Sequence, residues 1–183
     1  MSDFPRPGKG KAASRTQRAS MLRVDQAGEF GATRIYAGQL AVMGDRHPMS
    51  RRIAAMARQE ERHREHFDRM VAEGGVRPTL LQPIWDVAGF ALGAVTAAIG
   101  PEAAMACTAA IETEIDRHYQ QQLQELGSDD MELSGTIRDF QREEVEHRDI
   151  AIASGAEDAP AHALLSGAIR LGCRAAIALS KRI

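Results

Sequence analysis

The chain has 183 residues, a length that suits one domain with a single hydrophobic core. Apolar residues make up 44% and charged residues 26%, which is typical of a globular protein and excludes a disordered chain. The net charge of −2 and the low aromatic content of 4% do not favour a nucleic-acid partner. Cys107 and Cys173 lie far apart without a CxxC motif, which excludes a disulfide framework and a zinc ribbon.

The first residues differ in composition from the rest of the chain. Residues 1–18 are rich in proline, glycine and basic residues, so we predict a disordered basic tail there and a single domain over residues 19–183. Up to Arg23 there are six basic residues and one acidic residue, a charge of +5, which leaves −7 for the remainder. No apolar segment of the signal-peptide type occurs in this region, and this indicates a cytoplasmic setting.

In the remainder of the chain, residues that start or end helices recur at helix-length intervals, and apolar and polar residues do not alternate with the period of two that is typical of strands. This pattern predicts an all-α protein. Prolines fall at expected helix starts and glycines at expected helix ends. Ser128, Asp129 and Asp130 offer N-caps for the fifth helix. We predict six helices, at about residues 20–43, 48–73, 83–99, 101–126, 130–154 and 160 to the end.

A faint internal repeat relates two pairs of these helices. EFGATRIYAGQLAVMG, which starts at Glu29, aligns with ETEIDRHYQQQLQELG, which starts at Glu112, and six residues coincide. About 31 residues after each glutamate, RQEERHR aligns with REEVEHR. The first two helices and the fourth and fifth helices therefore form duplicated hairpins, which we expect to pack about a pseudo-twofold axis.

The repeat carries a pattern of metal ligands. Residues i and i+3 share a helix face, so Glu-x-x-His directs a carboxylate and an imidazole toward the same point. Two such pairs, together with a glutamate from each preceding helix, match the ligand set of di-iron or di-manganese carboxylate bundles. The predicted terminal ligands are Glu29 and Glu112, the predicted bridges are Glu60 and Glu144, and each ion receives one histidine. The complete predicted set is Glu29, Glu60, His63, Glu112, Glu144 and His147.

The alternative interpretation is that these residues are solvated charges on helix surfaces. We assign the neighbouring glutamates to the surface, namely Glu61, Glu65, Glu114, Glu143 and Glu146. The other four histidines, His47, His66, His118 and His162, are interpreted as structural. Tyr36 and Tyr119 lie two turns beyond the terminal glutamates on the same helix faces. Either tyrosine could hydrogen-bond near the metals or carry an electron, and Tyr119 is a candidate catalytic residue, but core packing also explains both.

Two apolar segments, residues 84–99 and 160–180, contain few charges. The first has 16 residues, short of the roughly 20 that a spanning helix needs. The second carries Arg170 and Arg174 on one stripe, where they could snorkel while the opposite face lies in the lipid headgroups. We predict that both segments lie on a membrane surface. The alternative is that they form a third layer of the bundle or a dimer interface.

The motifs resemble those of the demethoxyubiquinone hydroxylases, the di-iron monooxygenases of ubiquinone biosynthesis. The residues that carry the resemblance are RVDQAGEFGATRIYAGQ (23–39), RQEERH (58–63), LLQPIWDVAGFALGA (80–94), AMACTAAIETEIDRHY (104–119) and REEVEHRDI (142–150). The resemblance implies a ferritin-like four-helix bundle with two additional apolar helices. It also implies that the six ligands selected by spacing hold two iron ions per chain.

The same resemblance implies an activity and a location. We expect hydroxylation of a demethoxylated polyprenyl benzoquinol with O2 and with electrons from NADH. No GxGxxG motif follows a strand, so NADH would bind in another way, or the electrons would come from the quinol or from a partner. The expected location is the cell membrane, peripheral and on the cytoplasmic side. A homo-oligomer or a partner protein of ubiquinone biosynthesis is expected, and nucleic acid is not.

Other helical bundles are alternatives to the hydroxylase. A ferritin-type iron-oxidising and iron-binding protein would use the same ligands but needs no apolar substrate channel. A rubrerythrin-like peroxidase usually carries a CxxC module, and a tRNA hydroxylase needs a basic surface, and the chain has neither. A metal-free helical scaffold would not need the six-residue pattern. The sequence therefore favours the hydroxylase.

Overall fold

The computed structural model describes residues 14–127 and 130–182, and within these ranges it contains six α-helices and no strand. The helices are α1 (Arg15–Met43), α2 (Ser50–Glu73), α3 (Gln82–Ile99), α4 (Pro101–Leu126), α5 (Met131–Ala153) and α6 (His162–Ser180). A short 3-10 turn, η1 (Ala156–Asp158), precedes α6. The all-α prediction and the two additional apolar helices are confirmed.

The helix boundaries differ from the predictions mainly at three starts. Helix α1 begins at Arg15 because Ser14 and Gln17 form a capping box, so residues 14–18 do not belong to a tail. Helix α2 begins two residues after Pro48, and α6 begins at His162 after the unpredicted turn. Asp130 caps α5 as predicted, whereas Ser128, Asp129 and residues 1–13 of the predicted tail lie outside the described residues.

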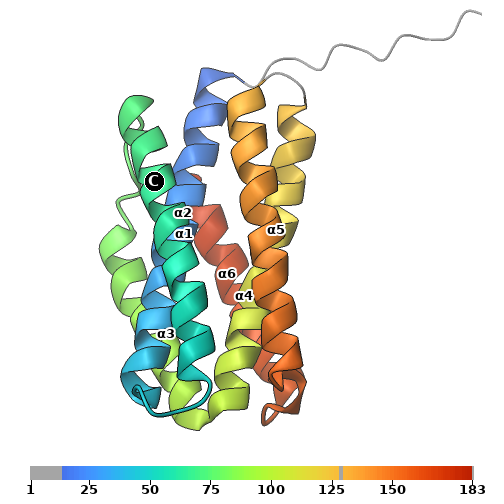
Figure 1. Cartoon of the computed structure of the whole chain (residues 1–183). Coiled ribbons are helices and arrows are strands. Elements are labelled where there is room, and N and C mark those ends of the chain that lie inside the picture. Colours follow the sequence, from blue (N-terminus) through green and yellow to red (C-terminus); the bar gives the residue numbers. More distant parts are fainter. Residues whose placement is uncertain (1–13, 128–129, 183) are drawn as a thin grey trace, which may run out of the picture.

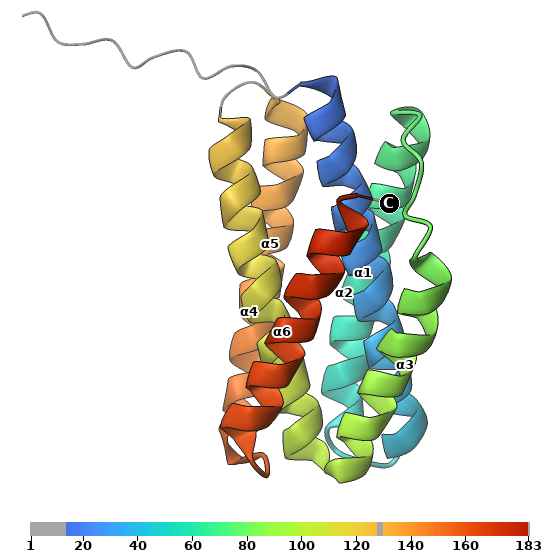
Figure 2. The same cartoon turned by 180° about the vertical axis from the view of Figure 1, so that it is seen from behind.

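The four long helices form the bundle, and α3 and α6 cover one of its faces. Figure 1 shows α2 and α5 on one side of the bundle, and Figure 2 shows α3 and α6 on the opposite side, against α1 and α4. Helices α1 and α4 run antiparallel, and each is followed by its hairpin partner, α2 or α5. The observed arrangement is that of the duplicated hairpins in the repeat.

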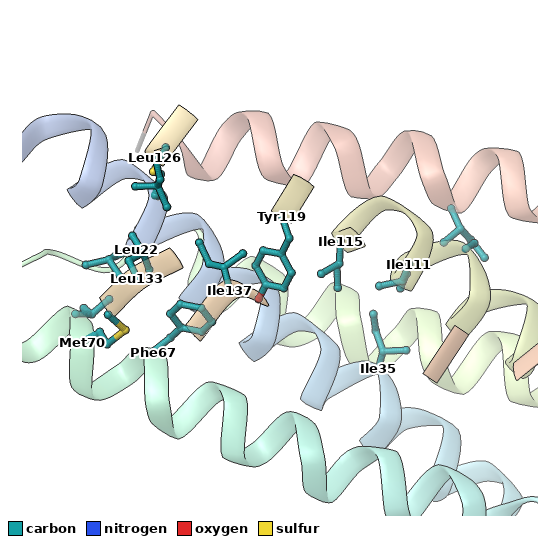
Figure 3. Packing of buried hydrophobic residues seen from close by; sticks show 14 of the residues in the cluster. Leu22, Ile35, Phe67, Met70, Ile111, Ile115, Tyr119, Leu126, Leu133 and Ile137 are labelled. Atoms are coloured by element: carbon teal, nitrogen blue, oxygen red, sulfur yellow. The ribbon is translucent and has the colours of Figure 1, made fainter. Parts of the chain in front are cut away.

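Buried apolar side chains fill the bundle at both ends. One cluster includes Leu22, Phe67, Leu126 and Leu133, one from each of the four long helices, and Figure 3 shows how these side chains lie. A second cluster occupies the other end and contains Ile53, Met56 and an alanine-rich stretch of α4. The predicted metal ligands lie between these two apolar ends.

The covering helices pack on the bundle in different ways. Helix α3 lies so close to α1 that a methyl group at Gly93 would overlap the carbonyl oxygen of Ile35. Both covering helices are long and apolar enough to cross a membrane by length and composition alone, although α3 is two residues longer than the predicted apolar segment. Their outer surfaces expose large apolar side chains, among them Val87 and Ile84 of α3 and Leu164 and Leu171 of α6.

Candidate metal centre

The six predicted ligands come together in the middle of the bundle. Each of the four long helices contributes one glutamate, and α2 and α5 each add a histidine one turn later. All six side chains are buried, and none is more than 1% exposed. The alternative that these residues are solvated surface charges is therefore wrong for this part of the chain.

The six residues form two overlapping groups of donor atoms. Glu29, Glu60, His63 and Glu144 make the first group, which we name the His63 position. Glu60, Glu112, Glu144 and His147 make the second group, the His147 position. Within each group the donor atoms lie within 4.8 Å of one another. Glu60 and Glu144 belong to both groups, an arrangement that suits the bridging role predicted for them.

The histidines direct their Nδ1 atoms at the carboxylates. His63 Nδ1 lies 3.0 Å from a Glu144 oxygen and 3.6 Å from a Glu29 oxygen, and His147 Nδ1 lies 2.9 Å from a Glu60 oxygen. Neither Nδ1 atom has a hydrogen-bond partner. Six carboxylate oxygens of the four glutamates are also buried without a partner. Buried polar atoms are normally paired with a hydrogen-bond partner. The eight unpaired atoms are carboxylate oxygens and imidazole nitrogens, which are donors that divalent cations bind, and they are directed at one centre.

Burial and mutual repulsion change the proton affinity of these groups. Burial raises the pKa of Glu60 and Glu112 well above their usual range, and the negative charge of Glu144 raises both further. Burial also raises the pKa of Glu144. Without positive charge the site therefore retains protons, and divalent cations would displace them.

The two histidines differ in proton affinity although the repeat makes them equivalent. Burial lowers the pKa of His63, but the carboxylates of Glu144 and Glu29 beside its Nδ1 atom outweigh burial and raise it to about 10. Burial lowers the pKa of His147, and the charge of Glu112 does not compensate. The two positions thus have different electrostatic surroundings.

Each buried tyrosine donates a hydrogen bond to the terminal glutamate of the opposite hairpin. Tyr36 donates to Glu112 at 2.9 Å, and Tyr119 donates to Glu29. Of the alternatives for these residues, a hydrogen bond beside the centre is observed, and both rings also belong to the hydrophobic core. The tyrosines hold one oxygen of each terminal carboxylate and leave the other unpaired.

Two glutamates that we assigned to the surface have buried contacts. Glu143 accepts a contact from His63 Nε2 at 3.2 Å, and Gln59, which spacing did not select, lies 2.9 Å from His147 Nε2. The signal was present, because both residues immediately precede the predicted bridging glutamates at equivalent positions of the repeat. Their contacts cross between helices, however, and helical periodicity within one segment does not reveal them.

Glu114 is the second exception. It is 2% exposed and accepts contacts from Arg170 at 2.7 Å and Arg174 at 3.1 Å. The prediction that these arginines snorkel is therefore wrong, because their charges attach α6 to α4. The contact of the opposite face with lipid headgroups stays a prediction. The apolar face of α6 points away from the bundle and remains exposed.

The remaining histidines make structural contacts, as predicted for them. His66 contacts Thr136, and His162 contacts the backbone oxygen of Ala156. His118 is buried, with Nε2 3.3 Å from an oxygen of Asp25, to which Gln122 donates at 2.8 Å. Burial raises the pKa of Asp25.

A cavity of about 510 Å³ lies between α1, α3, α4 and α6. Its volume is within the range of about 300–1,000 Å³ for small-molecule sites. Apolar side chains form most of its wall, and Asp25, Glu29, His118 and Tyr119 form its main polar region. Glu29 is the only one of the six predicted ligands that lines this cavity. The cavity therefore meets the metal centre at the His63 position.

Comparisons with known proteins agree with this architecture. Residues 16–180 match the family described as "Ubiquinone biosynthesis protein COQ7". The 3-demethoxyubiquinol 3-hydroxylase of Rhodospirillum rubrum is 57% identical over 162 residues, which cover 88% of this chain and 76% of that protein. The human NADPH-dependent 3-demethoxyubiquinone 3-hydroxylase, mitochondrial, is 48% identical and covers 89% and 76%. The 5-demethoxyubiquinone hydroxylase, mitochondrial, of Saccharomyces cerevisiae is 40% identical and covers 89% and 77%.

Proposed function

The chain belongs to the family of the ubiquinone biosynthesis protein COQ7, and from this premise we propose how its bundle performs a hydroxylation. It is a demethoxyubiquinol hydroxylase, a monooxygenase that adds oxygen to the ring of a polyprenyl quinol. The family match and the names of these relatives favour a hydroxylase over the ferritin-type, peroxidase, tRNA-modifying and metal-free alternatives.

The proposed cofactor is a pair of iron ions held by the six buried residues. The observation that supports it is the set of eight unpaired donor atoms in two overlapping groups. Glu29 and His63 would hold one ion, Glu112 and His147 would hold the other, and Glu60 and Glu144 would contribute to both. When bound, the iron pair would supply the chemistry that reduces O2. One oxygen atom would enter the ring, the other would leave as water, and the electron donor would provide two electrons.

The two buried tyrosines orient the terminal ligands Glu29 and Glu112. Tyr119 restrains Glu29 from the opposite hairpin, so the free oxygen of Glu29 keeps its direction toward the His63 position. Tyr36 restrains Glu112 in the same way. Fixed ligands reduce the reorganisation that the reaction requires, because the donor atoms are already placed before the cofactor and substrate bind.

The cavity is the proposed substrate site. The quinol ring would lie near Glu29 and Tyr119, where the cavity reaches the centre, with Asp25 and His118 as polar neighbours for its oxygen substituents. The polyprenyl tail would follow the apolar walls formed by α3 and α6. These walls exclude water from the reacting ring, which protects the oxidant from side reactions.

The exposed apolar faces of α3 and α6 are the proposed membrane contact. These helices lie on the same face of the bundle, beside the cavity (Figure 2). A bundle resting with this face in the lipid headgroups would take up a polyprenyl substrate directly from the bilayer. We propose a peripheral location on the cytoplasmic side of the cell membrane, and an oligomer or a partner protein would cover the same surface in solution.

The proposed electron donor is a reduced nicotinamide nucleotide. The resemblance led us to expect NADH, whereas the names of the human and several other mitochondrial relatives contain NADPH. Turnover measured with each nucleotide separately decides between them.

A turnover assay on the iron-reconstituted protein tests the proposed function. With a short-chain demethoxyubiquinol and ¹⁸O₂, we expect a hydroxylated product that contains one labelled oxygen atom. Ala168→Trp places a large ring in the cavity wall, whereas Ala175→Trp on the same helix lies outside the cavity lining. Loss of turnover in the first variant alone, with unchanged iron content, supports the substrate site. Equal turnover in both variants contradicts it.

A further inference from the structure

Gln59 and Glu143 occupy equivalent positions in the two halves of the repeat but have different charges. Each immediately precedes a proposed bridging glutamate, Glu60 or Glu144. Each side chain reaches across the bundle to the histidine of the other hairpin. The repeat therefore has a Gln–Glu pair where exact symmetry would place two identical residues.

The two side chains are also hydrogen-bonded to each other. Gln59 Nε2 donates to Glu143 Oε2 at 3.1 Å, which directs the amide oxygen of Gln59 toward His147. The same Glu143 oxygen lies 3.2 Å from His63 Nε2. Both histidines therefore donate through Nε2–H, and Nδ1 of each ring faces the carboxylates, where a metal ion would displace any proton that it holds.

Two carboxylates in this pair would repel each other at this distance, and two amides would leave both histidines without an anionic partner. One carboxylate and one amide give each histidine an acceptor for its Nε2–H and also hydrogen-bond to each other. The consequence is that His63 has a negatively charged partner and His147 a neutral one. Arg62 also contacts Glu143, at 3.4 Å, but its side chain is 60% exposed, so solvent screens much of its charge.

We propose that Gln59 and Glu143 are positioning residues that make the two metal positions unequal, so that the His63 position binds the first divalent ion. An anionic partner makes an imidazole a stronger metal ligand, and loss of such a partner typically lowers metal affinity by about 10–100-fold. The inference rests on the proposed function, since it requires that the six residues bind metal. It places the tighter ion beside Glu29, at the position that the cavity reaches.

The test is an anaerobic titration of the metal-free full chain with Co²⁺, followed by visible absorption and equilibrium dialysis. We expect two binding steps whose affinities differ by more than the statistical ratio for identical sites. The tight step should persist in His147→Ala and disappear in His63→Ala. Glu143→Gln should weaken it by about 10–100-fold, and Glu146→Gln, an exposed neighbour on α5, should not.

A double substitution separates electrostatic from merely structural roles. Gln59→Glu combined with Glu143→Gln keeps one carboxylate and one amide in contact but exchanges their histidine partners. We expect the order of binding to reverse, with the tight step now lost in the His147→Ala background. Two equal steps in the wild type, or an unchanged order after the exchange, overturn this inference alone. Absence of Co²⁺ binding to the wild type overturns the proposed metal centre and the inference with it.

Discussion

The two halves of the chain, residues 15–99 and 101–180, repeat one pattern of predicted metal ligands but attach their third helices differently. In the first half α3 meets α1 through glycines, so that the two backbones are in contact at Gly93 and Gly38. In the second half α6 is joined to α4 by a buried glutamate and two arginines. The residues of the candidate metal centre are thus equivalent in the two halves, whereas the contacts that attach the covering helices α3 and α6 differ.

This difference has a physical reason. A di-metal centre needs equivalent donors on both sides, so both hairpins keep the same ligand types. The covering helices need only to enclose the cavity and expose an apolar face. Backbone contact in the first half makes α3 a fixed wall, and side-chain contacts in the second half leave α6 easier to displace.

The largest expected effect comes from removing what the halves share. In Glu60→Ala combined with Glu144→Ala, each ion loses both bridging ligands, so the iron content after anaerobic reconstitution should fall from about two ions per chain to nearly none. The control Glu65→Ala combined with Glu146→Ala removes two exposed carboxylates from the same helices. Metal analysis that finds equal iron in both proteins would disprove the assignment of the bridges.

The next effect tests the glycine contact of the first half. Gly93→Ala should destabilise the protein by about 3 kcal/mol, because the added methyl group overlaps backbone atoms that cannot move independently. Gly172→Ala on α6 has open space around its Cβ position and should be neutral or stabilise by about 0.5–1 kcal/mol through helix propensity. Denaturant unfolding compares the two variants, and a similar loss in both would contradict the distinction between the covering helices.

A smaller effect is expected at the ionic contact of the second half. Glu114→Gln should reduce the free energy of unfolding by about 1–2 kcal/mol, since the carboxylate is buried but its arginine partners are half-exposed. Asp86→Asn, which weakens the exposed pair between α3 and Arg34, should cost less than about 0.5 kcal/mol. Hydrogen exchange should also show faster opening of α6 in Glu114→Gln, and unchanged exchange there would argue against the proposed attachment.

The last comparison distinguishes the two histidines in the metal-free protein. The pKa of His63 is raised from 6.5 to about 10, so the folded state holds a proton that the unfolded state loses in this range. The stability from His63 is complete below pH 6.5 and is lost as the pH rises toward 10, at most about 1.4 kcal/mol per pH unit. The pKa of His147 is lowered, so it is neutral in both states above pH 6.5.

Substitution of each histidine by glutamine measures this difference. The slope of unfolding free energy between pH 7 and 9 should become less negative in His63→Gln and stay unchanged in His147→Gln. The buried carboxylates contribute to the slope in all three proteins, so the contribution of each histidine, together with its effect on neighbouring carboxylates, is measured by the difference between the variants. Identical slopes in the two variants would indicate that the halves are electrostatically equivalent.

The sequence by itself determined the helices, the duplication and the six buried residues that come together as the candidate centre. Glu-x-x-His works at this level because residues i and i+3 share a face in any helix, whatever surrounds it. Glycines after α1 and α4 likewise indicated where those helices end. Gly44 and Gly127 have positive φ angles, which glycine adopts easily whatever surrounds it. The start of α1 was missed because its capping box lies in a stretch whose composition resembles a tail.

Only the tertiary structure decided which neighbours of these residues matter. In the sequence, Glu143 and Glu114 look like the exposed Glu65 and Glu146. In the structure, Glu143 contacts His63 across the bundle, and Glu114 forms an ion pair with Arg170 of α6. The cavity also depends on how α3 and α6 cross α1 and α4. Helical periodicity fixes which residues share a face, whereas the rotation and crossing of the packed helices fix which faces meet, and this depends on the shapes of all the side chains between them.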